Sequence, residues 1–355
     1  MHLPLSEYLE TNKLASVFSS RSSTYKFYWL LAIIESVECG KQEITKKEIF
    51  ARIITNSWYT INYFRISFGK QDLIQKAVVN ILEHEKPDIK INKEQLLSLL
   101  INSNNSNTLK NLEHFNNYVP HRFLTPWFPK EKAEVSYTHK KRIYSSSVNF
   151  KNDCLYALSK DSVTINPNWF LYLKYNSKVL KDFCFWNLSL YLQLRNPNVP
   201  DIGNKLIKPN FRNTLTNQRA NYWNIVFKQL GSIKCIYTNK DLFIDSYALD
   251  HFVPYAFVSH NLIWNLIPID KNFNSSKGDK LPSMDFFFDK FFELQKTAFE
   301  IIRNEYPNSK LLEDYLTIYP AINKIEDFEY LRYKENIQPL ITIANNNGFA
   351  YMICL

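Results

Sequence analysis

Glycine is scarce in this sequence, which has only 6 glycines in 355 residues. Loops that cradle nucleotide phosphates need several glycines within one short motif, and neither the P-loop pattern nor the dinucleotide-binding pattern occurs. The sequence therefore excludes those two nucleotide-binding classes. If the protein is activated by an energy-dependent step, we expect that step to come from a separate ATPase or sensor protein.

The sequence also lacks paired cysteines and long apolar runs. Its 5 cysteines are scattered singly with no CxxC pair, so we expect no structural zinc. An odd number of unpaired thiols and no recognisable signal peptide favour the cytoplasm. No run of 18 apolar residues occurs, so we expect no membrane span.

Acidic residues are missing from Ile202 to Lys240, within a chain of formal net charge +9. A basic stretch of this kind is typical of a segment that contacts a nucleic acid backbone. A solvated helix face followed by a loop explains the pattern equally well. The candidate nucleic-acid contacts in this stretch are Lys205, Lys208, Arg212 and Arg219.

The hydrophobic pattern predicts a mostly α-helical α+β protein. Tyr25–Cys39 is apolar on most sides, which predicts a helix buried within a bundle, and Thr45 with Glu48 forms a capping-box pattern for the next helix. Further helices are expected at 72–85, 93–102, 109–118, 169–173, 181–194, 216–230, 284–305, 309–316 and 325–333. Strands are expected at 148–158 and 162–165.

Three prolines between Val119 and Pro129 break the helical pattern and indicate a domain boundary. We expect a helical N-terminal domain at 1–130, for regulation or partner docking, and a mixed connecting region at 131–230. A small functional module at 231–290 and C-terminal helices at 291–355 complete the predicted organisation. The phenylalanine-rich stripe of 284–305 is expected to be core or an inter-domain seam, and an exposed stripe would instead imply a partner protein.

The main concentration of chemistry-bearing residues lies between Cys235 and Pro282. Asp250 and His251 are adjacent there, and Asn265, Asn274 and Lys277 follow at close intervals. Carboxylate and amide oxygens suit a hard divalent cation such as Mg²⁺ or Mn²⁺. His251 is the side chain best able to accept a proton near neutral pH. Asp245, Asp270 and Asp279 are expected to cap turns, and binding of the metal through water is the alternative.

The segment from Asp250 to Pro282 resembles the ββα-metal module of the HNH endonucleases, and particularly the HNH domain of RNA-guided CRISPR effector nucleases. The stretch around Val119–Pro129, with YWLLAI, NYFRISFGKQD and YLQLRNPNVP, is similar to a group of uncharacterised bacterial HNH proteins with long helical N-terminal regions. The resemblance implies two antiparallel strands and one helix that hold a single metal ion. We expect the first strand at 242–245 or 247–250, the second strand at 264–267, and a helix that begins near Asn274.

The resemblance also implies residue roles. Asp250 and Asn274 would bind one divalent metal, Mg²⁺ or Mn²⁺, while His251 would activate water and Asn265 would brace the loop. Lys277 would lie one helical turn after Asn274 and contact the scissile or adjacent phosphate. Two further basic residues are candidates for contact with the nucleic acid, namely Lys271 and Lys280.

Three functions fit this pattern. The first is a metal-dependent endonuclease acting on double- or single-stranded DNA, in bacterial restriction or anti-phage defence as the resemblance implies. The second is an RNA-cleaving toxin, because the same site could cut RNA. The third is a nucleic-acid-binding subunit of a larger complex whose nuclease module is silent.

Overall fold

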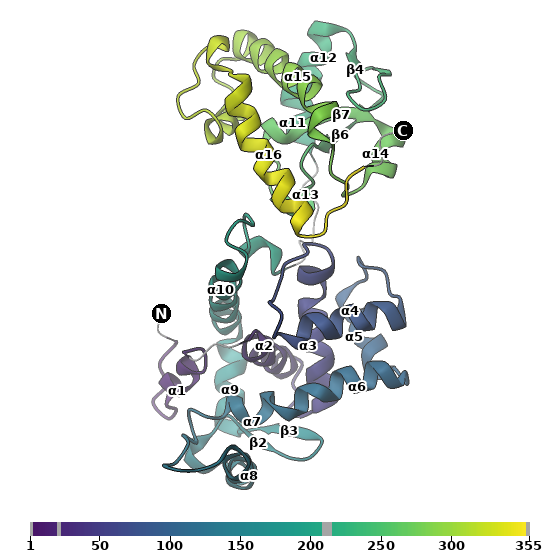
Figure 1. Ribbon diagram of the computed structural model, residues 1–355. Helices are drawn as coiled ribbons and strands as arrows, with labels where there is room; N and C mark the ends of the chain where they lie inside the picture. Colours follow the sequence, from purple (N-terminus) through teal and green to yellow (C-terminus); the bar gives the residue numbers. More distant parts are fainter. Residues whose placement is uncertain (1–2, 20–22, 208–214, 353–355) are drawn as a thin grey trace. The chain divides into compact units, whose positions relative to one another are not determined.

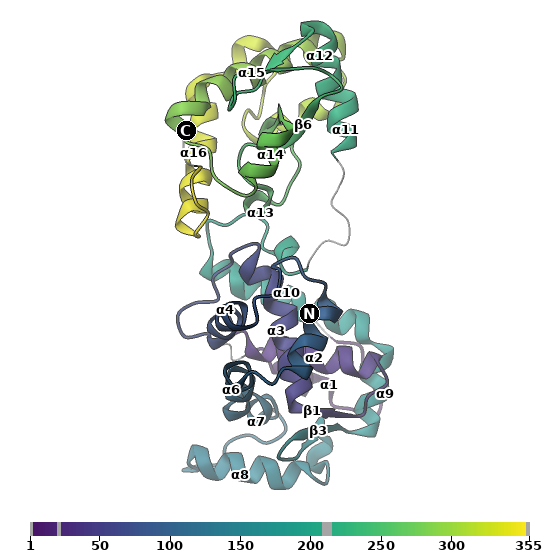
Figure 2. The same cartoon turned by 90° about the vertical axis from the view of Figure 1, so that its right-hand side faces the viewer.

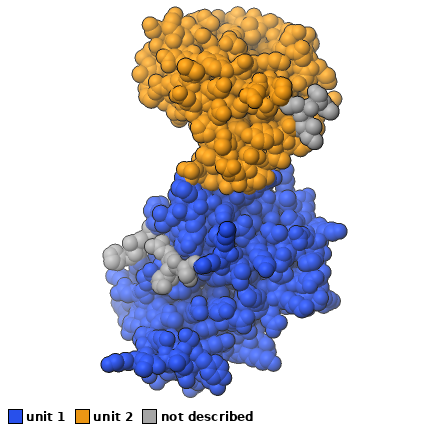
Figure 3. Space-filling view, viewed as in Figure 1, with its two compact units in different colours: residues 1–197, 202–208 blue, residues 198–201, 209–355 orange. Residues whose placement is uncertain are grey.

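The computed structural model describes residues 3–19, 23–207 and 215–352, which divide into two compact units. Unit 1 contains Met1–Pro197 and Ile202–Lys208, and unit 2 contains Asn198–Asp201 and Pro209–Leu355 (Figure 3). Helices dominate both units and the sheets are small and antiparallel, which confirms the predicted fold class.

Unit 1 is a helical bundle built around α2 (Tyr25–Glu38) (Figure 1). Trp29, Leu30 and Ile33 of this helix are fully buried, as its apolar sequence predicts. The other helices of unit 1 are α1 (Thr11–Ser16), α3 (Lys46–Asn62), α4 (Leu73–Glu85), α5 (Lys93–Asn102), α6 (Ser106–His114), α7 (Val119–Phe123), α8 (Ser136–Ser147), α9 (Pro167–Tyr175) and α10 (Ser177–Arg195).

A three-stranded sheet joins distant parts of unit 1. The central strand β3 (Ser162–Ile165) pairs with β2 (Tyr156–Leu158) on one side (Figure 1) and with β1 (Glu43–Thr45) on the other (Figure 2). The indole of Trp29 donates to the Tyr156 hydroxyl at 3.1 Å, and that hydroxyl donates to the Pro120 carbonyl at 2.6 Å. The expected domain boundary at residue 130 therefore falls inside unit 1.

The region after that expected boundary also differs from its predicted secondary structure. Residues 136–147 form helix α8, and only 156–158 of the expected strand 148–158 forms a strand. Helix α8 buries only Ile143 and Ser147, so it carries almost no apolar periodicity from which a helix could be predicted.

Unit 2 contains a β-hairpin followed directly by a short helix. Strand β6 (Tyr247–His251) pairs antiparallel with β7 (Leu266–Asp270), and α14 (Lys271–Lys277) packs against both strands. The Asp270 carboxylate accepts a hydrogen bond from the Phe273 N–H at 2.9 Å, as expected of a helix-capping residue. Helix α14 therefore begins at Lys271, whereas the sequence predicts that it starts near Asn274, three residues later.

The rest of unit 2 surrounds this hairpin. Helix α15 (Met284–Glu305) covers the predicted length, and its Phe291 ring stacks on Phe252 with centroids 3.9 Å apart. The Gln295 amide donates to the Leu266 carbonyl at 2.7 Å. The remaining α-helices and strands of unit 2 are α11 (Thr216–Gln218), α12 (Asn224–Leu230), β4 (Ile233–Lys234), β5 (Asp241–Leu242), α13 (Tyr255–Val258) and α16 (Tyr330–Asn346). Two further segments, Lys310–Thr317 and Ile325–Asp327, form 3₁₀ helices.

Candidate active site

Strand β6 places the two predicted chemical groups next to each other at its end. Asp250 is opposite Ile267 and His251 is opposite Leu266 in the hairpin. Because side chains alternate along a strand, the two residues point to opposite faces. Their burial agrees with this, since Asp250 is half-buried and His251 is only 7% exposed.

The imidazole of His251 is held in place by the loop that precedes β7. Its Nε2 lies 3.0 Å from Asn261 Oδ1, and the His260 backbone is a second hydrogen-bonding partner. Burial lowers the pKa of His251 below its usual 6.5, an effect larger than the opposing attraction of Asp250. His251 is therefore neutral at physiological pH, the form that can accept a proton.

Asn265 braces the chain immediately after His251. It is fully buried, its Oδ1 accepts from the Val253 N–H at 2.8 Å, and its Nδ2 donates to the Val253 carbonyl at 2.8 Å. The Phe252 N–H donates to the backbone carbonyl of Asn265. These bonds fix the turn between β6 and α13, so Asn265 acts on the position of His251 through the backbone.

Lys277 occupies a different position from the one expected of a phosphate contact. Its Nζ donates to Asp250 Oδ2 at 2.7 Å and to the His251 carbonyl at 2.9 Å, and its side chain is 0% exposed. An ammonium group buried in this way cannot contact a phosphate without leaving these partners. In this structure Lys277 holds Asp250 in place and balances its charge.

The predicted metal ligands supply two hard oxygen donors. Asn274 is half-buried on α14, and its side-chain amide makes no hydrogen bond within the described ranges. Over the same residues, Asp250 accepts a hydrogen bond through Oδ2 only. Mg²⁺ usually keeps several waters beside one or two carboxylates, so this donor set fits such an ion. No group of three or more His, Cys, Asp or Glu residues that could hold a metal occurs among the residues described.

The predicted nucleic-acid contacts fall into different environments. Arg219 stacks on Tyr247, with Cζ 4.1 Å from the ring centroid, and is half-buried. Lys271 and Lys280 are exposed on and just after α14. Lys205 is fully buried in unit 1, and this burial removes it from a phosphate-contacting surface. Lys208 and Arg212 lie outside the described residues.

Residues 235–283 match the family model described as HNH endonuclease. This segment is an HNH module. The match spans the hairpin and α14, and it includes Asp250, His251, Asn265, Asn274 and Lys277. No curated protein and no solved structure was found to match the chain. Across the described residues, the structure contains no helix both long and apolar enough to cross a membrane.

Some residues that shape the HNH module carry no recognisable signal in the sequence. Asn261 contacts His251 from a loop ten residues later. From beyond the module, Asp314 accepts a hydrogen bond from the Ile263 N–H at 2.8 Å, and the Tyr333 hydroxyl donates to the Trp264 carbonyl at 2.5 Å. Only the folded arrangement of the C-terminal helices identifies these supports.

Proposed function

We propose that this protein is a metal-dependent endonuclease that hydrolyses phosphodiester bonds in DNA. The observation that carries the proposal is the HNH match over residues 235–283, with His251 at the end of β6 beside Asp250. HNH modules act on nucleic acids, and the formal net charge of +9 suits a polyanionic substrate.

His251 is the proposed general base. A neutral imidazole takes a proton from water, and the oxygen of that water attacks phosphorus. Its contacts with Asn261 and His260 keep the ring oriented, and the Asn265 brace keeps the backbone after it in place. Burial of the ring maintains the neutral form over the physiological pH range.

Asp250 and Asn274 are the proposed holders of one divalent ion, Mg²⁺ or Mn²⁺. When bound, such an ion stabilises the negative charge that develops on the phosphate and on the departing 3′ oxygen. Lys277 keeps the Asp250 carboxylate in a fixed position, because it is bonded both to that carboxylate and to the His251 carbonyl. Exposed cations on the module, Lys271 and Lys280, are proposed to contact the substrate backbone.

A role in bacterial restriction or anti-phage defence, in the cytoplasm, is part of this proposal and rests on the resemblance of the module. An unregulated nuclease would damage its own cell. We therefore propose that unit 1 restrains the module or receives a separate ATPase or sensor protein.

Incubation of the full chain with supercoiled plasmid and with single-stranded RNA tests the proposal. Each substrate is incubated with Mg²⁺, with Mn²⁺ and with a chelator. The expected result is plasmid nicking or linearisation that needs a divalent ion and stops with the chelator. Cleavage of RNA but not of plasmid would show that the substrate is RNA and not DNA. Binding of either nucleic acid without cleavage under any condition would contradict nuclease activity.

A further inference from the structure

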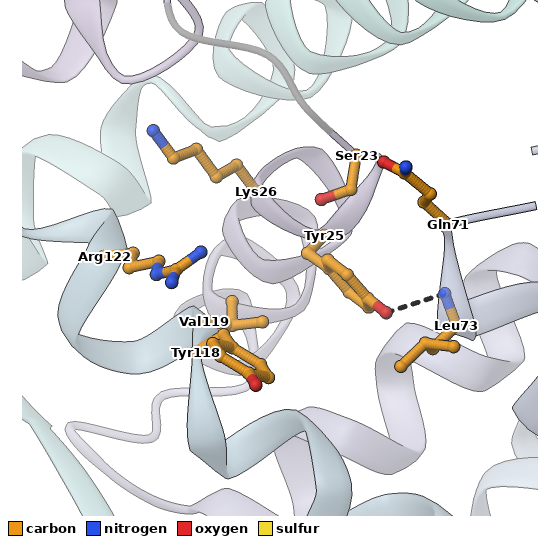
Figure 4. Close-up of a pocket in the computed structure, with 8 residues that line it drawn as sticks. All are labelled: Ser23, Tyr25, Lys26, Gln71, Leu73, Tyr118, Val119 and Arg122. Carbon is orange, nitrogen blue, oxygen red and sulfur yellow. Dashed lines mark hydrogen bonds between the residues drawn. The ribbon is translucent and has the colours of Figure 1, made fainter. Parts of the chain in front are cut away.

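A pocket in unit 1, far along the chain from the HNH module, combines positive charge with aromatic side chains. It has a volume of about 220 Å³ and lies where the starts of α2, α4 and α7 meet. The pocket is lined by Ser23, Tyr25, Lys26, Gln71, Leu73, Tyr118, Val119 and Arg122 (Figure 4).

Two cations face this pocket from different helices. Figure 4 shows the side chains of Lys26 and Arg122 extending to the same side, with the Tyr25 ring directed away from them towards Leu73. The Lys26 ammonium donates to the Val17 carbonyl at 3.0 Å, and burial, followed by repulsion from Arg122, lowers the pKa of Lys26. No carboxylate forms an ion pair with Arg122 within the part of the chain that is described. A bound anion would relieve the repulsion between these two groups.

The acidic and phenolic groups near the pocket are hydrogen-bonded to other partners. Asp72 is 5% exposed, and its Oδ2 accepts from the Thr24 N–H at 2.6 Å and the Thr24 hydroxyl at 2.7 Å. The Tyr25 hydroxyl accepts from the Leu73 N–H at 2.7 Å, and burial raises the pKa of Tyr25 so that it stays neutral. More positive charge lies nearby, because Lys140, Arg122 and His139 add to burial in lowering the pKa of His121 to about 4.

The remaining lining favours a planar group next to the anion. Tyr118 is 47% exposed and Arg122 Cζ lies 4.8 Å from its ring centroid, while Leu73 and Val119 add apolar surface. Ser23 and Gln71 supply neutral hydrogen-bonding groups. Arginine and lysine bind phosphate, and aromatic rings stack on bases.

We infer that this pocket binds a nucleotide, with its phosphate between Lys26 and Arg122 and its base against Tyr118. The nucleotide is either free or one unit of a single strand, since both present the same phosphate and base. This site goes beyond the proposed nuclease activity and does not depend on it.

Calorimetric titration of the full chain tests the inference, with AMP as the free nucleotide and a five-nucleotide single-stranded DNA in chelator as the strand. We expect saturable binding of at least one probe. Arg122→Gln and Lys26→Gln should each weaken it about tenfold, because each removes one charged hydrogen bond. Arg122→Lys, which keeps the charge, should weaken it less.

Lys174→Gln is the matched control, since Lys174 is an exposed lysine on α9 outside the pocket. It should leave the affinity unchanged, and circular dichroism of every variant should match the parent chain. Binding of AMP would identify a free nucleotide as the ligand of the pocket. Binding of the DNA strand but not of AMP would identify a single strand as the ligand. The inference is overturned if neither probe binds, if all variants bind equally, or if inorganic phosphate binds as tightly as AMP.

Discussion

At the scale of single residues, the site combines a side chain that is kept neutral with one that is kept charged. His251 is kept neutral by burial, which outweighs the hydrogen-bond acceptors around its ring, while Asp250 is partly exposed and paired with a buried lysine. The sequence places these residues together but assigns Lys277 to the substrate, because spacing along a helix cannot distinguish a side chain turned inward from one turned outward. The structure identifies it instead as the partner of Asp250.

Replacement of Lys277 by methionine should destabilise the protein. The variant leaves Asp250 without its partner, and we expect a loss of about 1–3 kcal/mol in the free energy of unfolding. This loss is smaller than that expected for a fully buried ion pair, because Asp250 is still in contact with solvent. Denaturant unfolding measures this loss, with exposed Lys280→Met as the control. Mg²⁺ should stabilise Lys277→Met more than the parent chain, because the ion can then neutralise Asp250. Equal unfolding of parent and variant would contradict the pairing.

The rate of cleavage should depend on the protonation of His251. The pKa of His251 is lowered below 6.5. The neutral imidazole therefore predominates at pH 6.5 and above, and it becomes protonated only at lower pH. We expect a flat rate from neutral pH down to about 6.5, followed by a fall at lower pH. Single-turnover rates across this range measure the profile. A rate that declines from pH 8 downwards would indicate a raised pKa and contradict this account.

At the scale of elements, the hairpin and α14 are arranged by local signals that the sequence displays. The alternation in β6 and the capping Asp270 both appear in the sequence, whereas the 3₁₀ turn at Ile263–Asn265 shifts the second strand from the expected 264–267 to 266–270. That turn is held by Asp314 and Tyr333. Its position could not be predicted because its partners are distant in sequence.

Asn265→Ala tests the brace between these elements. The substitution leaves the buried N–H and carbonyl of Val253 without partners, and we expect a loss of about 2–4 kcal/mol in the free energy of unfolding. The exposed Asn272→Ala is the control and should change stability little. If Asn265→Ala unfolds at the same denaturant concentration as the parent chain, the brace contributes nothing measurable.

At the scale of the whole molecule, the chain divides into two compact units. The predicted boundary at residue 130 fails to separate them because β1 and β3, more than a hundred residues apart, pair within unit 1. Strands of three and four residues are too short to show a hydrophobic alternation from which their pairing could be predicted. The helical character of both units could be predicted, since their apolar helices carry strong patterns.

The positive charge of the molecule predicts a salt-dependent affinity for DNA. Each cation that contacts a phosphate contributes about 0.9 to the slope of log affinity against log salt concentration. Fluorescence anisotropy with a short duplex, in chelator, should therefore give a slope that falls by about one unit in Lys271→Gln and in Lys280→Gln. Buried Lys205 is expected to contribute nothing. Unchanged slopes in both module variants would place the DNA elsewhere.

The central claim is that His251 activates water for phosphodiester hydrolysis, and His251→Ala tests it most directly. Cleavage rate and DNA affinity are measured on the same preparation, with Lys174→Ala as the matched control. We expect cleavage to fall by about 10²–10⁴-fold while the affinity stays within error of the parent chain. Cleavage by His251→Ala at the parental rate would contradict the account.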